Sequence, residues 1–256
     1  MKRHVAVSLA VAGLSLGLVG AASSAELTPE YKAPPPAVPY DFWSGFYAGV
    51  HIGWGWDQID DTSFAPASGA TTFEHVQRQG VLGGGQIGYN WLLNPNWLLG
   101  FETDISGADI HGTNTACSDT GCSSADGRTD VFGTARGRVG FVQGNWLLYA
   151  TGGFAYDHTT NNRTIVFVTH PVDAVFVGQS STASGWDGGW VVGGGSEWAF
   201  AHNWSVKAEW LYSEIDHSRT YTYAGPVSNP TGGNRDVSSR LDYNIVRAGV
   251  NYRFAP

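Results

Sequence analysis

Hydrophobic and polar residues alternate along eight segments of the chain beyond residue 43. In the third of these segments Trp97, Leu99 and Phe101 share one parity, while Glu102 and Asp104 share the other. A period of two places such sets on opposite faces of a β-strand. The predicted strands cover residues 44–56, 80–91, 97–108, 130–141, 146–157, 186–200, 204–215 and 239–254.

Each predicted strand has ten or more residues. Ten residues of a strand tilted by ~40° climb about 25 Å, which is the height of the apolar band of an outer-membrane barrel. Short turns alternate with long polar connections, as in such barrels. The turns lie at 92–96, 142–145 and 201–203, and the long connections at 57–79, 109–129, 158–185 and 216–238. The pattern predicts an all-β fold: an eight-stranded antiparallel up-and-down transmembrane β-barrel with short periplasmic turns and four long external loops.

Each predicted short turn ends in Asn, and a Trp follows it directly. These residues are Trp97, Trp146 and Trp204. Indole rings settle at the headgroup level of a membrane. Ordinary soluble hairpins with Trp beside the turn are the alternative interpretation, and the strand lengths favour the membrane. We therefore predict an aromatic girdle at the short-turn end, made of Trp91, Trp97, Phe141, Trp146, Trp198, Trp204 and Phe254.

The polar parity is rich in glycine and carries nearly balanced charges, which suits a crowded lumen with apolar residues facing lipid. These inward-facing charged residues could line a conducting path, or they could form a plug of salt bridges. An eight-stranded barrel is only just wide enough for side chains to fill, which favours the plug. The predicted lumen charge network consists of Glu102, Asp104, Arg136, Arg138, Glu197, Lys207, Glu209, Arg247 and Arg253.

The N-terminal segment is predicted to lie outside the fold. Residues 1–25 have a basic start, an apolar run and small residues before a cleavage site, as in a secretory signal peptide. Residues 26–43 are a Pro-rich periplasmic linker, and 44–256 form the barrel. Removing Lys2 and Arg3 leaves 12 basic against 22 acidic residues and changes the net charge from -8 to about -10.

Composition agrees with a β-rich membrane protein, since the chain has 35 Gly, 11 Trp and 11 Tyr but only 14% charged residues. The acidic balance argues against nucleic acid as a partner. Cys117 and Cys122 lie in a polar stretch, and in an exported protein they predict a local disulfide. A small metal site is the alternative, but no pair of histidines lies near them.

No catalytic site, metal site or cofactor is predicted. The runs at 83–85 and 193–195 lack the Lys-Ser/Thr pair of a phosphate-binding loop. Four histidines fall in or beside the predicted loops near many Ser and Asp residues, but nothing in the sequence determines their mutual geometry. They are His111, His158, His170 and His217.

Several motifs together resemble the porin-family outer-membrane β-barrel proteins of alphaproteobacteria, which are major surface antigens related to opacity proteins. They include WSGFYAGVHIGWGW, GVLGGGQIGYNW, WLLGFETDISGA, NWLLYATGGFAY and the ending VRAGVNYRF. The resemblance implies an eight-stranded barrel with roles in envelope integrity, host-surface contact and limited diffusion. Family chains commonly finish on an aromatic residue, whereas Ala255 and Pro256 follow Phe254 here.

We therefore expect an integral protein of a Gram-negative outer membrane, without enzymatic activity, that has a structural and surface-antigen role and leaves weak porin activity open. The alternative is a surface binding or adhesion protein whose external loops engage a host molecule or a small ligand such as haem. The expected partners are outer-membrane lipid, lipopolysaccharide and the barrel-assembly machinery.

Overall fold

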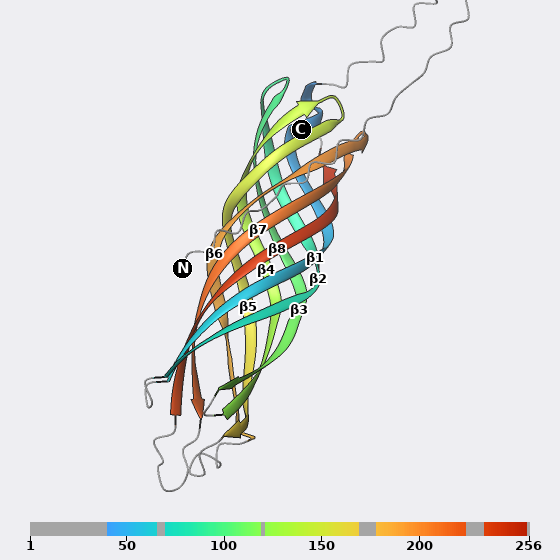
Figure 1. Cartoon of the computed structure of the whole chain (residues 1–256). Coiled ribbons are helices and arrows are strands. Elements are labelled where there is room, and N and C mark those ends of the chain that lie inside the picture. The colour runs from blue at the N-terminus through green and yellow to red at the C-terminus, as the bar shows by residue number, and fades with distance from the viewer. Residues whose placement is uncertain (1–39, 66–69, 119–120, 169–177, 224–232, 255–256) are drawn as a thin grey trace, which may run out of the picture. The chain divides into compact units, whose positions relative to one another are not determined.

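The computed structural model describes residues 40–65, 70–118, 121–168, 178–223 and 233–254. Eight antiparallel strands form a closed barrel in chain order, with β8 pairing back onto β1 (Figure 1). The predicted signal peptide and all but the last four residues of the predicted linker lie outside the described residues. The strands are β1 (Gly45–Ala65), β2 (Ala70–Asn94), β3 (Trp97–Ser118), β4 (Gly121–Gln143), β5 (Trp146–Val168), β6 (Ser180–Ala201), β7 (Trp204–Tyr223) and β8 (Gly233–Arg253).

The folded part begins earlier than the predicted boundary at residue 44. Tyr40–Trp43 forms a turn of 3-10 helix, η1, at the short-turn end of the barrel. The Trp43 side chain is buried, and its Nε1 donates a hydrogen bond to the Gly144 carbonyl at 3.1 Å. The Arg253 guanidinium lies 4.8 Å from the centre of the Trp43 ring. Burial of a large indole thus adds this part of the predicted linker to the barrel.

The strands are 20 to 25 residues long, and each is longer than the predicted strand at its position. The predicted short turns are present as two-residue connections, but the four predicted long loops are corrected. Most of their residues continue the strands as hairpins: β1 runs to Ala65 and β2 begins at Ala70. The alternation here is among Thr, Ser, Asn and charged residues, which a hydrophobic pattern does not detect although Thr fits a strand well.

Two ladders of the barrel stop early at the end opposite the two-residue turns, which we call the external end after the predicted orientation. The β2–β3 ladder ends at Gln79–His111, and the β6–β7 ladder ends at Gly189–Ile215. The same strands continue their pairing with their other neighbours. In the described residues the external end therefore separates into two four-stranded sheets, β7-β8-β1-β2 and β3-β4-β5-β6. We call the two points of separation the β2/β3 fork and the β6/β7 fork.

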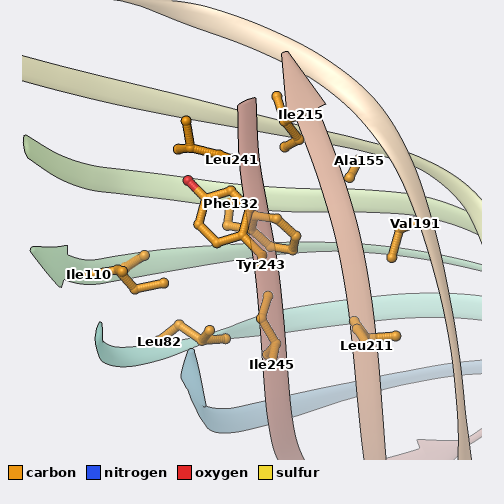
Figure 2. Packing of buried hydrophobic residues seen from close by; sticks show 11 residues of the cluster. Leu82, Ile110, Phe132, Ala155, Val191, Leu211, Ile215, Leu241, Tyr243 and Ile245 are labelled. Carbon is orange, nitrogen blue, oxygen red and sulfur yellow. The ribbon is translucent and has the colours of Figure 1, made fainter. Parts of the chain in front are cut away.

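The barrel interior is layered. Trp43, Leu98, Leu147 and neighbouring apolar side chains pack at the short-turn end. The charged network lies above them, and a second apolar cluster lies beyond it, where Phe132 and Tyr243 converge from different strands (Figure 2). Among the described residues, no helix has the length and apolar character needed to cross a membrane.

Candidate functional site

All nine residues of the predicted lumen charge network are buried inside the barrel. Alternation along the strands brings them there, because they share the inward parity of β3, β4, β6, β7 and β8. Arg136 lies at the centre. Its guanidinium nitrogens contact Glu102 at 2.6 Å, Glu209 at 2.9 Å and Asp104 at 3.0 Å.

Further cations complete the pairing of these carboxylates. Arg247 donates through Nε to Glu209 at 2.5 Å and through Nη2 to Asp104 at 2.9 Å. Lys207 Nζ lies 2.8 Å from Oε1 of Glu102. Each of the three carboxylates therefore contacts at least two cations, which is the arrangement that makes a buried charge tolerable.

A second branch is built around Glu197. It accepts hydrogen bonds from Ser205 at 2.5 Å and Asn251 at 3.1 Å, and the Arg138 guanidinium lies 3.3 Å away. Arg253 lies 3.7 Å from Glu197 and also donates to the Phe42 carbonyl, so it connects the network to η1. The structure thus brings all nine predicted residues into one continuous network.

Sequence reasoning missed the neutral partners of this network. Tyr47 and Tyr149 donate their hydroxyls to Glu102 and Glu209 at 2.8 Å and 3.1 Å. His51 contacts Gln86 at 2.5 Å and Ser106 at 2.7 Å. Inward parity is the only sequence signal for these residues, and it does not say which strands face each other across the lumen.

The apolar cluster beyond the network corrects the prediction of a polar lumen. Its side chains share the inward parity of the charged residues, and in β8 Tyr243 and Ile245 are followed two residues later by Arg247. The interior therefore carries a hydrophobic layer at the level of the external half of the barrel. The cluster consists of Leu82, Ala108, Ile110, Phe132, Ala155, Val191, Leu211, Ile215, Leu241, Tyr243 and Ile245 (Figure 2).

A second polar cluster lies beside the β6/β7 fork. His217 Nε2 lies 2.9 Å from Asp157 and 3.2 Å from Asp187. In the described part of the chain these three residues are the group compact enough to hold a metal ion, with ligand atoms within 4.8 Å of one another. Arg219 donates to both carboxylate oxygens of Asp187, and Tyr243 donates to Asp157 at 2.7 Å. A metal ion would therefore compete with a guanidinium that already neutralises Asp187.

The histidines do not gather into one site. His217 is buried in the lumen, whereas His111 is exposed on the outer wall. His158 is half-buried and lies 5.1 Å from the ring of Trp186. His170 lies outside the described residues.

All seven predicted girdle residues lie on the outer face near the short turns, with 41 to 52% of each exposed. Their rings are close neighbours: Trp97 and Phe141 at 5.6 Å, and Trp146 and Trp198 at 6.1 Å. Further aromatic residues at this end, outside the predicted set of seven, are Phe46, Tyr89, Phe200 and Tyr252. Sequence reasoning also missed a second aromatic belt, nearer the external end, made of Trp54, Trp56, Tyr156, Trp186, Trp190 and Tyr212.

The cysteines lie in the β3–β4 hairpin. Register places Cys117 directly opposite Cys122, and Cys122 is disulfide-bonded. No described cysteine is free. The side chain of Cys117 lies outside the described residues.

Comparison with known proteins places this barrel among outer-membrane proteins. The chain is 28% identical over 96% of its length to the 31 kDa outer-membrane immunogenic protein of Brucella melitensis, of which the match covers 99%. It is 22% identical over 99% of its length to the 25 kDa outer-membrane immunogenic protein of Brucella canis, again covering 99% of that protein. Both relatives are named as immunogenic proteins of the outer membrane.

Solved structures with a similar fold include OprG of Pseudomonas aeruginosa, with a TM-score of 0.43 and 14% identity over 83% of this chain and 98% of that one. Ail of Yersinia pestis gives a TM-score of 0.37 and 12% identity, and the match covers 81% of this chain and 99% of Ail. The model of the outer membrane protein beta-barrel domain matches residues 12–254. The chain therefore belongs to the family of outer membrane protein beta-barrel domains and is an integral β-barrel of a Gram-negative outer membrane, similar to immunogenic surface proteins.

Proposed function

We propose that the protein is a sealed structural barrel of the outer membrane that carries surface-exposed hairpins and has no enzymatic or porin activity. The stacked filling of the lumen supports this proposal. A charged layer around Arg136 and an apolar layer around Phe132 follow each other along the barrel axis, and both are buried. An ion that crossed the lumen would have to break the first layer and enter the hydrophobic second one, where a charge is costly.

Conductance in planar bilayers tests the seal. We expect no discrete single-channel steps from the purified wild-type barrel. The double variant Phe132→Ala with Tyr243→Ala serves as the comparison. It removes two large aromatic side chains of the apolar layer, whose ring centres lie 5.5 Å apart. Regular unitary steps from the wild-type protein would contradict the proposal and restore the weak-porin alternative.

The surface-binding alternative rests on the length of the hairpins. β5 continues to Val168, and its ladder with β6 reaches Thr164–Ser180. The paired stretch of residues 159–164 and 180–185 is polar and could present a binding surface for a host molecule or a small ligand such as haem. Removing the paired tips of β5 and β6 should abolish surface binding and leave envelope permeability unchanged if the alternative holds. Unchanged binding would contradict it.

The expected partners follow from the outer surface. Two aromatic belts bracket an apolar wall that includes Val50 and Ile52, so lipid and lipopolysaccharide are the proposed surroundings. The barrel-assembly machinery is the proposed folding partner. Phe254 directly follows β8, and its N–H donates to the Phe46 carbonyl at 2.9 Å, while Ala255 and Pro256 lie outside the described residues. Deleting these two residues should leave the assembled amount in the outer membrane unchanged if Phe254 is the residue that is read.

A further inference from the structure

We propose that a hollow on the outer wall at the β2/β3 fork binds a sugar ring of lipopolysaccharide. This inference rests on the proposed outer-membrane orientation, in which the fork lies at the external end. The hollow has a volume of about 400 Å³, within the range of ligand sites. Its lining residues are Trp56, Asp57, Gln58, Gln77, Arg78, Gln79 and His111.

The hollow exists because a ladder ends there. Gln79 is the last β2 residue that pairs with β3, opposite His111. Gln77 precedes Gln79 by two residues in β2. In the described ladders it pairs only with Gln58 of β1. Beyond Gln79 the β2–β3 ladder stops, although β3 still lies close at Gly112, where an added Cβ would be 3.0 Å from the Gln77 carbonyl oxygen. The hollow lies at this end of the ladder.

Outward-facing side chains surround this hollow. Trp56 pairs with Gln79 across the β1–β2 ladder, and Gln79 pairs with His111 across the β2–β3 ladder. These three side chains therefore form one row across three neighbouring strands on the outer face. Trp56 is 38% exposed, so part of its ring surface is open to a ligand.

The polar groups around Trp56 are available for hydrogen bonding. In the described part of the chain the carboxamides of Gln58, Gln77 and Gln79 make no side-chain hydrogen bond. Each offers two donors and one acceptor. His111 uses Nδ1 toward Asp109 at 3.3 Å, and its Nε2 points to no described partner.

This combination fits a neutral polyol better than an anion or an apolar ligand. An indole packs against the C–H face of a sugar ring, and carboxamides pair with vicinal hydroxyls. The two charges in the lining compensate each other, because Arg78 Nη2 lies 2.7 Å from Asp57. No uncompensated cation in the lining would therefore select a phosphate or a carboxylate.

The position of the hollow identifies the source of the sugar. Trp56 belongs to the external aromatic belt, ten residues beyond Phe46 of the girdle at the short-turn end. That interval climbs about 25 Å, so the hollow lies at the level of the external headgroups. Five of its lining side chains, those of Trp56, Gln58, Gln77, Gln79 and His111, have the outward parity of their strands and face sideways into the leaflet, where the core sugars of lipopolysaccharide surround the barrel. A soluble glycan would meet the open end of the barrel first.

Native mass spectrometry of the purified barrel in detergent micelles tests the site. The probes are rough-type lipopolysaccharide, which carries core sugars, lipid A, which lacks them, and the released core oligosaccharide. We expect the wild-type barrel to prefer rough lipopolysaccharide over lipid A by about tenfold, equivalent to ~1.4 kcal/mol. Trp56→Leu and the double variant Gln77→Ala with Gln79→Ala should each reduce this ratio to about one.

Two matched controls separate sugar binding from general effects. Trp54→Leu changes the next outward residue of the same strand, and Gln143→Ala removes an exposed carboxamide at the opposite end of the barrel. Both should keep the preference. Equal wild-type affinity for the two lipids, or a preference that survives Trp56→Leu, would overturn the proposal.

The released oligosaccharide distinguishes the two sources of sugar. Binding of this probe as tight as that of rough lipopolysaccharide would overturn the membrane lipid as the source and indicate a soluble glycan. Lipid A binding reports the affinity for the lipid independently of the core sugars. A failed sugar site is therefore distinguishable from a general loss of lipid binding.

Discussion

Glu102 is the most highly connected carboxylate of the lumen network. It contacts Arg136, Lys207 and Tyr47 at distances of 2.6 to 2.8 Å, and its side chain is 3% exposed. Removing it leaves the buried Lys207 with Glu209 at 4.0 Å as its nearest carboxylate among the described ion pairs and takes one of three carboxylates from Arg136. An exposed ion pair contributes little because solvent screens it. Asp216, whose side chain is 74% exposed beside Arg240, is a suitable comparison.

We expect Glu102→Ala to lower the free energy of unfolding by about 3–5 kcal/mol. Asp216→Ala should change it by less than ~1 kcal/mol. Urea-induced unfolding of the two variants in lipid bilayers measures both values. Equal losses would show that the network does not stabilise the barrel more than a surface pair does.

Gly84 allows the closest approach between two strands within the glycine run 83–85. A Cβ built on Gly84 would lie 1.9 Å from the Ile105 carbonyl oxygen, whereas one on Gly85 would have no neighbour nearer than 3.6 Å. Gly84 faces the lumen and Gly85 faces outward. The same substitution therefore has opposite steric consequences at adjacent positions.

We expect Gly84→Ala to destabilise the barrel by about 1–3 kcal/mol through overpacking. Gly85→Ala should be neutral or slightly stabilising, because alanine restricts the unfolded chain. The two unfolding midpoints, measured side by side, check this. A Gly85→Ala variant as unstable as Gly84→Ala would indicate that chain flexibility, and not space, is required at this run.

Parity alone predicted that the nine charged residues face inward, and all nine are buried there. It could not predict their partners. Arg247 and Asp104 are 143 residues apart and meet at 2.9 Å across the lumen. Such a contact depends on the closure of β8 onto β1, and no local sequence signal contains it.

At the scale of elements, the strands were predicted where one face is apolar and missed where both faces are polar. β5 illustrates this, since residues 146–157 alternate clearly while its extension to Val168 begins with His158 and continues with the polar run 159–164. Outside the apolar band, cross-strand pairing and β propensity maintain the strand without a hydrophobic period.

The girdle elements should determine the depth of the barrel in the membrane. We expect the triple variant Trp97→Ala, Trp146→Ala and Trp204→Ala to lose about 1 kcal/mol for each ring in lipid bilayers, because the rings contact both neighbours and the interface. Unfolding measured in bilayers and in detergent micelles provides the comparison. The loss should be larger in bilayers, and the same loss in both media would contradict an anchoring role.

The two forks are properties of strand pairing that alternation does not reveal. All four strands continue past Gln79 and Gly189, although the β3–β4 ladder shifts register between Gly107 and Ile110, next to the β2/β3 fork. Side chains take over where backbone pairing ends, as Arg219 and Asp187 do across the β6/β7 fork.

At the scale of the whole molecule, eight ladders and a filled lumen make a closed, cooperative structure. We expect the purified protein to migrate faster in gel electrophoresis when it is not boiled, because the intact barrel resists detergent unfolding. Boiling should convert it to the mobility of a chain of 27.4 kDa or, after removal of the leader, slightly less. Identical mobility before and after boiling would contradict a closed barrel.

The sequence by itself determined the number of strands in the barrel, their inward and outward faces and the aromatic girdle at the short turns, because each of these follows from a period of two against lipid. Only the tertiary structure decided which charges meet, that an apolar layer also fills the lumen, and where Trp56 and Gln79 frame a hollow at a fork. These features depend on which strands lie next to or across from each other. Ring closure and register establish that arrangement, whereas alternation within one strand reports only on that strand and its surroundings.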